Sequence, residues 1–277
     1  MTADLVAEQR PEAPPTSAGA SGVATAAEVA ARTLRQYARS PQLLVSSVIA
    51  SATFIVLFRY IFGGAIELGQ VPYVDFLIPG MVLTSVLITG TGTAVAVAED
   101  ADKGLIDRLR SLPVPRLALL AGRALGDLVI NGWGIVVTAG LGFLVGFRLH
   151  GSLGQAILAF FICLACGFAF LWLFICLGLV SGSAQAAQGT SYLIYPLIFV
   201  SSAYVPVNTL PGWMQPIAEH QPITVMANAV RSLALGDPAL AGLGHTTSYW
   251  VSLSLIWSAA LVVVLAPVAV VLYRRAS

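Results

Sequence analysis

The residue types that most often perform chemistry are few in this chain, and their spacing is unfavourable. Cys163 and Cys166 form a CxxC pair, a spacing used by redox and metal sites, but both lie with Cys176 inside one apolar run. A buried cysteine behaves as a small hydrophobic residue, so packing explains these thiols better than redox chemistry. The 3 histidines lack metal-ligand spacing, and no nucleophile has a plausible base beside it. The sequence therefore predicts neither an enzyme nor a metal site.

The only lysine, Lys103, argues against a nucleotide site within the chain. A P-loop needs Gly-Lys-Ser/Thr, in which backbone N–H groups hold the phosphates and the lysine reaches the β and γ oxygens. Asp102 precedes Lys103 and Gly104 follows it, so the motif is missing. If ATP drives this protein, a separate subunit must hydrolyse it. We therefore expect no cofactor in the chain itself.

Charged residues are nearly missing from the apolar part of the sequence. Arg59 stands near one end of an apolar run, where snorkelling to the surface explains it better than substrate binding. Asp127 stands near the start of another run and is predicted to pair with Arg123, one helical turn earlier. Ion-coupled carriers usually keep charged residues at mid-depth as relays. The pattern therefore argues against a proton antiporter.

Six long apolar stretches make up most of the chain and must position any functional residue. Crossing a bilayer takes about 20 apolar residues of helix. The stretches are continuous rather than alternating, which argues against barrel strands. The chain is 57% hydrophobic and only 10% charged. We predict an all-α polytopic membrane protein whose six transmembrane helices are Leu43–Phe62, Phe76–Ala98, Leu125–Phe147, Leu153–Val180, Ser191–Val207 and Tyr249–Tyr273.

Basic residues set the expected orientation. With six crossings, all but three of the 14 lysines and arginines fall on one side, and the exceptions are Arg59, Arg148 and Arg231. Under the positive-inside rule, both termini and the loop 99–123 are then cytoplasmic. Residues 1–25 are rich in Ala, Pro, Ser and Gly and are predicted to be a disordered cytoplasmic tail.

Residues 26–40 have an amphipathic pattern with three arginines. Thr25 and Glu28 have the spacing of a capping box, so we expect a basic helix lying at the cytoplasmic interface. A simple extension of the first span is the alternative, which Ser40-Pro41 disfavours. Residues 41–277 would then form the six-helix transmembrane domain.

The cytoplasmic segment 99–112 carries a second amphipathic pattern. Leu105, Leu109 and Leu112 make an apolar stripe with Ile106 beside it, and Pro113 ends the helix. Such a helix lies on lipid or inserts its stripe into a groove on a partner. The acidic residues at its start would be repelled by anionic headgroups, which favours a protein partner.

The outer segment, residues 206–235, contains four prolines and cannot be one unbroken helix. It is nonetheless apolar, which predicts two re-entrant half-helices between the fifth and sixth spans, with Trp213 at headgroup level. An outer gate over an export path and a loop that merely caps the bundle both fit this pattern.

Two segments resemble those of type-2 ABC export permeases. They are EDADKGLIDRLRSLPVPRLALLAGR, between the second and third spans, and FVSSAYVPVNTLPGWMQPIAEHQPITVMANAVRSL, after the fifth. In the second, Pro206, Pro211-Gly212-Trp213, Pro222-Ile223-Thr224 and Arg231 follow that family's spacing. The resemblance covers about residues 30–275. Within the family the chain looks most like the daunorubicin-resistance-type permeases.

The resemblance implies a homodimer seated on two copies of an ABC ATP-binding subunit that holds Mg-ATP. The 26–40 helix would be the family's elbow helix. The 99–112 helix would be the coupling helix, with contact residues Glu99, Gly104, Leu105, Ile106, Leu109, Arg110 and Leu112. The outer gate would comprise Pro206, Pro211, Gly212, Trp213, Pro222, Thr224 and Arg231. Candidates for the substrate path or dimer interface are Phe54, Phe58, Arg59, Tyr192, Tyr195 and Phe199.

These features favour the permease subunit of an exporter in the plasma membrane of a prokaryote, with hydrophobic or amphipathic cargo such as a drug, an antibiotic-like metabolite or a lipid. A permease for a lipid-linked polysaccharide is the alternative within the class. A stand-alone secondary carrier would need an inverted repeat or an ion relay, and neither is evident in the sequence. The net charge of +1 by itself says nothing about a nucleic-acid partner, and none is expected for a permease of this kind.

Overall fold

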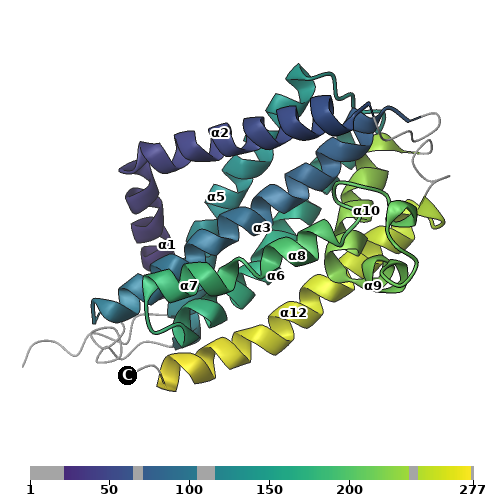
Figure 1. Ribbon diagram of the computed structural model, residues 1–277. Coiled ribbons are helices and arrows are strands. Elements are labelled where there is room, and N and C mark those ends of the chain that lie inside the picture. The colour runs from purple at the N-terminus through teal and green to yellow at the C-terminus, as the bar shows by residue number, and fades with distance from the viewer. Residues whose placement is uncertain (1–21, 65–70, 105–115, 237–242, 276–277) are drawn as a thin grey trace, which may run out of the picture.

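The computed structural model describes residues 22–64, 71–104, 116–236 and 243–275, and every regular element in these ranges is a helix (Figure 1). The long helices and the N-terminal helix are α1 (Gly22–Ala38), α2 (Pro41–Val56) with its π-helical continuation η1 (Leu57–Phe62), α3 (Tyr73–Asp102), α5 (Arg116–Leu144), α6 (Leu153–Val180) and α12 (Thr247–Arg275). The shorter helices are α7 (Ala184–Ser191), α8 (Ile194–Phe199), the 3-10 turn η2 (Val207–Thr209), α9 (Gln215–His220) and α10 (Pro222–Leu235).

Within these ranges, 5 helices are long and apolar enough to cross a membrane, which supports the multi-pass architecture. They are α2 with η1, α3, α5, α6 and α12, and they correspond to the first four predicted spans and the last. Of their most apolar windows, 61% is buried in α3 and in α6, but only 11% in α2 with η1 and 17% in α12. The core therefore lies around α3 and α6. The helix formed by α2 and η1, and helix α12, lie at the periphery of the bundle and leave most of their apolar surface uncovered.

The fifth predicted span is wrong as a single helix. Residues 184–199 form two short helices, α7 and α8, and residues 200–204 are turns. Pro196 explains the break, because its ring nitrogen cannot donate to Tyr192, so the chain must restart a helix with the proline in the first turn. In Figure 1, α7 and α8 carry the chain from the end of the bundle near α1 to the end near α9 and α10. Whether this broken element completes a sixth crossing stays a prediction.

The N-terminal helix differs from the predicted one at its start. α1 begins at Gly22, so Thr25 lies inside the helix, and the expected capping box with Glu28 does not form. Thr25 is instead buried, because α1 packs against α5. Residues 22–25 thus belong to α1 rather than to the predicted tail, residues 1–21 lie outside the described residues, and the position of α1 at a bilayer surface stays a prediction.

The outer segment contains two helices, α9 and α10, which meet at Gln221. Every residue of α10 from Ile223 to Leu235 is buried, and the helix contacts α3, α6 and α12. The break between two short helices is as predicted, whereas entry into the outer leaflet stays a prediction.

Candidate functional site

The expected coupling helix is only partly described, and its predicted start is wrong. Residues 99–102 are the last turn of α3, where Glu99 pairs with Lys103 (2.9 Å between Oε2 and Nζ), and Gly104 follows with a φ of 66°. A separate helix therefore does not begin at Glu99. The remaining residues assigned to the coupling contact lie outside the described residues. They are Leu105, Ile106, Leu109, Arg110 and Leu112.

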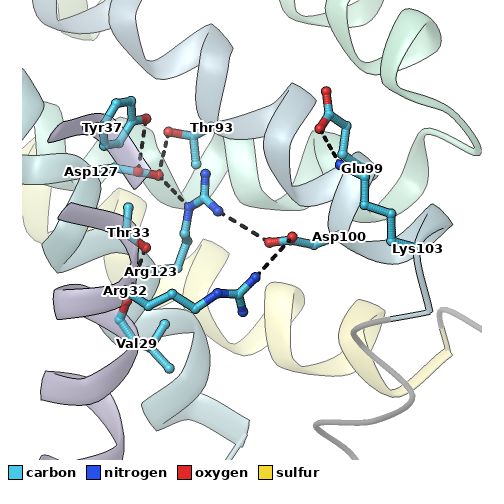
Figure 2. Close-up of polar contacts among 10 residues, drawn as sticks. All are labelled: Val29, Arg32, Thr33, Tyr37, Thr93, Glu99, Asp100, Lys103, Arg123 and Asp127. Atoms are coloured by element: carbon cyan, nitrogen blue, oxygen red, sulfur yellow. Dashed lines mark hydrogen bonds and ion pairs between the residues drawn. The ribbon is translucent and has the colours of Figure 1, made fainter. Parts of the chain in front are cut away.

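A buried polar cluster lies beside this turn, and Asp127 is its centre (Figure 2). The Asp127 carboxylate accepts hydrogen bonds from Arg123 Nε (3.0 Å), Thr93 Oγ1 (2.8 Å) and Tyr37 (3.2 Å from the phenol oxygen). Only 2% of Asp127 is exposed. Burial, and secondly the carboxylate itself, raise the pKa of Tyr37, so the phenol stays protonated and donates. The predicted pair of Arg123 with Asp127 is confirmed.

Asp100 joins this cluster to the end of α3. Its carboxylate lies 3.3 Å from Arg123 Nη1 of α5 and 3.7 Å from Arg32 Nη2 of α1. Figure 2 shows Arg123 between the two carboxylates, with Arg32 reaching Asp100 from below Arg123. The cluster therefore connects three helices at the point where the segment 103–115 leaves α3 and enters α5.

The α1–α5 contact is unusually close because two glycines of α5 face α1. A Cβ on Gly122 would lie 2.5 Å from the carbonyl oxygen of Ala26, and one on Gly126 would lie 2.7 Å from Cβ of Thr33. Larger residues would push the helices apart. α1 and α5 thus form one unit, and Asp100 bridges α3 to it.

At the opposite end of the bundle, Arg231 of α10 forms a second polar cluster. Only 1% of Arg231 is exposed, and its guanidinium donates to the carbonyl oxygens of Phe76 (3.0 Å) and Ser202 (2.8 Å) and to Asn228 Oδ1 (2.8 Å). The guanidinium carbon also lies 3.6 Å from the centroid of the Phe76 ring. These partners are all neutral, and burial lowers the pKa of Arg231 to about 9. The cation therefore ties α3 and α10 to the turns after α8.

These turns, residues 200–204, lie directly on α3. A Cβ on Gly80 would lie within 1.9 Å of the carbonyl oxygen of Ala203, so only glycine permits this approach. Two hydrogen bonds fix the same contact, from the Tyr73 hydroxyl to the Tyr204 carbonyl oxygen and from the Tyr204 hydroxyl to Thr84 Oγ1, each 3.0 Å. We call this contact, together with the Arg231 cluster, the outer junction.

The predicted gate residues are only partly brought together. Thr224 joins the outer junction by accepting from the backbone N–H of Ser202 (3.1 Å), whereas Trp213 is 74% exposed. Pro206 precedes η2, and Pro222 begins α10. Pro211 and Gly212 lie in the connection before α9. The structure therefore brings Thr224 and Arg231 into one packed junction, and the other gate candidates lie along the stretch from the N-cap of η2 to the start of α10.

A row of stacked aromatic rings connects α2 and η1 to the outer junction. The Phe58 ring lies between those of Phe54 (6.4 Å between centroids) and Phe62 (5.2 Å), and it stacks on Tyr204 at 4.6 Å. Phe199 also contacts Tyr204, at 5.5 Å. Two of the candidate path residues, Phe58 and Phe199, thus meet at Tyr204, and a third, Phe54, stacks on Phe58.

The other candidates for the path lie apart from this row. Tyr192 and Tyr195 contact each other edge to face, 5.7 Å between centroids. The Nε of Arg59 is buried and has no hydrogen-bond partner among the described residues, and its guanidinium lies 5.8 Å from the Tyr60 ring. The predicted snorkelling of Arg59 to the membrane surface stays a prediction.

The cysteines lie in the helical core, as their apolar surroundings predict. Cys163 and Cys166 of α6 are fully buried. The Cys166 thiol also lies 3.4 Å from Ser254 Oγ, a polar contact between α6 and α12. In the structure these thiols are part of the packed helical core.

Sequence reasoning missed several residues of both clusters. Tyr204 and Asp100 are two of them. Neither position carries a local pattern that reveals a partner 23 or 120 residues away. The only signal in the sequence for the pair of Asp100 with Arg123 is that these residues stand near the two ends of the same loop.

Replacing Tyr204 by phenylalanine should separate the hydrogen bond from the stacking. Tyr204→Phe keeps the ring on Phe58 but removes the donor to Thr84, which should cost about 1 kcal/mol of stability. Thermal unfolding in detergent measures the shift. Tyr60→Phe is the matched control, because Tyr60 is 69% exposed. Equal midpoints for the two variants would contradict a role for the hydroxyl.

Comparison with known proteins supplies the family. The sequence profile described as ABC-2 type transporter matches residues 27–235. The daunorubicin resistance ABC transporter permease protein DrrB1 of Streptomyces coeruleorubidus is 35% identical over 246 residues, 88% of this chain and 84% of that protein. The probable doxorubicin resistance ABC transporter permease protein DrrC of Mycobacterium tuberculosis is 27% identical over 253 residues, 89% of this chain and 87% of that protein. The Escherichia coli inner membrane transport permease YadH is 25% identical over 203 residues, 70% of this chain and 76% of that protein.

The profile spans most of the helical bundle, including both polar clusters and the outer segment. The resemblance inferred from residues 99–123 and 199–233 is confirmed by these matches. This multi-pass membrane protein belongs to the ABC-2 type transporter family.

Proposed function

We propose that this chain is the permease subunit of an ATP-driven exporter of hydrophobic or amphipathic compounds, such as a drug or an antibiotic-like metabolite. The observation that carries the proposal is the 35% identity to a daunorubicin resistance permease along 84% of that protein. The apolar surfaces of the long helices and the row of aromatic rings from Phe54 to Phe199 suit such cargo.

ATP, as Mg-ATP, is held and hydrolysed by a separate ABC subunit, of which two copies bind two copies of this chain. The missing Gly-Lys-Ser/Thr motif supports this division of labour. A second copy of the chain has a surface to cover at α7 and α8, where Tyr192, Leu193, Leu197 and Phe199 are about half exposed or more.

The orientation follows from charge. In Figure 1, α1 and the C-terminal end of α12 lie at the end of the bundle where α3 ends and α5 begins. The residues of α1, those just after it and the last turn of α12 supply Arg32, Arg35, Arg39 and Arg274. We assign this end to the cytoplasm under the positive-inside rule, in a prokaryotic plasma membrane. The ATP-binding subunit then meets the segment 99–112, and the outer junction faces the exterior.

A substitution in the apolar stripe of that segment tests the proposal. Leu109→Asp puts a charge where the amphipathic pattern predicts contact with the ATP-binding subunit, so the complex should dissociate while the bundle remains inserted. The measurement is co-purification of the chain with the ATPase encoded beside it, followed by its hydrolysis rate. Ser111→Asp, on the opposite face of the predicted helix, is the matched control. A wild-type chain that purifies without any bound ATPase contradicts the proposal and favours a stand-alone carrier.

A further inference from the structure

The segment between α3 and α5 has an ion pair across its base. Asp100 lies near the end of α3, Arg123 lies two turns into α5, and their side chains are 3.3 Å apart. The segment 103–115, whose residues 105–115 lie outside the described part, leaves from one of these helices and enters the other. Any force on the segment therefore acts on two helices that this pair joins.

The Asp100 contact is not needed to neutralise Arg123. Arg123 already has a buried counter-ion in Asp127, at 3.0 Å, and only 10% of its side chain is exposed. Asp100, by contrast, has a 31% exposed side chain, so losing its charge leaves no unpaired charge in the core. The contact between Asp100 and Arg123 thus contributes little to neutralising Arg123. Its main effect is to link α3 to α5.

Arg32 extends the link to α1. It lies 3.7 Å from Asp100, and α1 is held against α5 by the close contacts at Gly122 and Gly126. A cavity of about 60 Å³ lies beside these side chains and is lined by Arg32, Asp100 and Arg123 together with apolar residues and three uncharged polar ones, Thr33, Gln36 and Tyr273. The side chains therefore have room to change partners without unpacking the helices.

We propose that Asp100 and Arg123 are positioning residues that make α3 move together with the α1–α5 unit when the ATP-binding subunit displaces the segment between them. Without the link, the segment moves but α3 and the α1–α5 unit do not move together. ATP hydrolysis is then uncoupled from transport. This inference rests on the function proposed above. It assigns the coupling to an ion pair inside the permease, behind the surface that meets the ATP-binding subunit.

The test uses the whole complex reconstituted in proteoliposomes, with doxorubicin fluorescence as the transport readout. Asp100→Asn is expected to lower doxorubicin moved per ATP hydrolysed at least about fivefold, the lower end of typical coupling between sites. Asp100→Glu keeps the carboxylate and should restore the ratio, which a merely structural role of residue 100 does not predict. Arg32→Gln should give a smaller loss, because Arg32 is more exposed and its contact longer.

The matched control for Arg32 is Arg35→Gln, an exposed arginine one turn further along α1. Combining Arg32→Gln with Asp100→Asn should cause no more loss than Asp100→Asn alone, because the shared contact is already gone. Additive losses would overturn the proposed linkage.

A second readout does not depend on the cargo. Spin labels at Gly92→Cys on α3 and Ser252→Cys on α12, both exposed, report whether α3 moves when ATP binds. The distance between them should change in the wild-type complex and stay constant in Asp100→Asn. An unchanged ATP response in Asp100→Asn overturns this inference and leaves the proposed function intact. A wild-type chain that binds no ATPase overturns the proposed function and, with it, the basis of the inference.

Discussion

Arg123→Leu is expected to destabilise the folded protein by about 3–5 kcal/mol, because it leaves the buried Asp127 carboxylate without its counter-ion. Thr93 and Tyr37 would still donate to Asp127, but two neutral donors do not replace a charge. The measurement is the thermal unfolding midpoint in detergent, together with the yield of monodisperse protein. A large drop in both is the expected result.

Two further variants show whether the lost charge is the cause. Arg123→Leu combined with Asp127→Leu should recover much of the stability, since both charges are removed. Arg116→Leu makes the same change at an exposed position at the start of α5 and should have little effect. An Arg123→Leu protein as stable as the wild type would show that Asp127 does not need its partner.

Gly80→Val is expected to prevent the outer junction from forming. Its Cβ would lie 1.9 Å from the carbonyl oxygen of Ala203 and 2.7 Å from the carbonyl carbon, and backbone atoms cannot move aside as the tip of a side chain can. We expect a loss of about 3 kcal/mol or more, the upper part of the range for overpacked sites. Thermal unfolding measures it.

The same helix provides the control for this substitution. A Cβ on Gly92 of α3 would meet nothing within 4 Å, so Gly92→Val should be close to neutral. Because both changes put the same residue into one helix, their difference isolates the contact with residues 200–204. Similar midpoints for the two variants would mean that these turns do not rest on α3 as described.

The sequence predicted those parts of the fold that depend on local patterns. Apolar length identified the spans around α2, α3, α5, α6 and α12, and a four-residue spacing identified the pair of Arg123 with Asp127. Both signals lie within one helix, where periodicity and spacing determine which side chains meet.

Contacts between distant segments were not predictable in this way. The break in the fifth stretch depends on Pro196. A proline can either occupy the first turn of a new helix or kink the middle of a longer one, and the sequence alone does not decide between these two outcomes. The partners of Arg231 include two backbone carbonyl oxygens, and a carbonyl group has no sequence signature. Packing of separate helices decides such contacts, so the composition of the outer junction appeared only in the structure.

The burial of α10 has a consequence for biosynthesis. α10 packs against α12, which follows it in the chain. α10 therefore becomes fully buried only after the ribosome has synthesised residues 247–275. Until then Arg231 is not fully buried, and the nascent protein contains a helix with a charged side chain in an incompletely packed bundle. Synthesis of α12 is thus the step that completes the packing around α10, and chains cut short before α12 should be captured by membrane quality control.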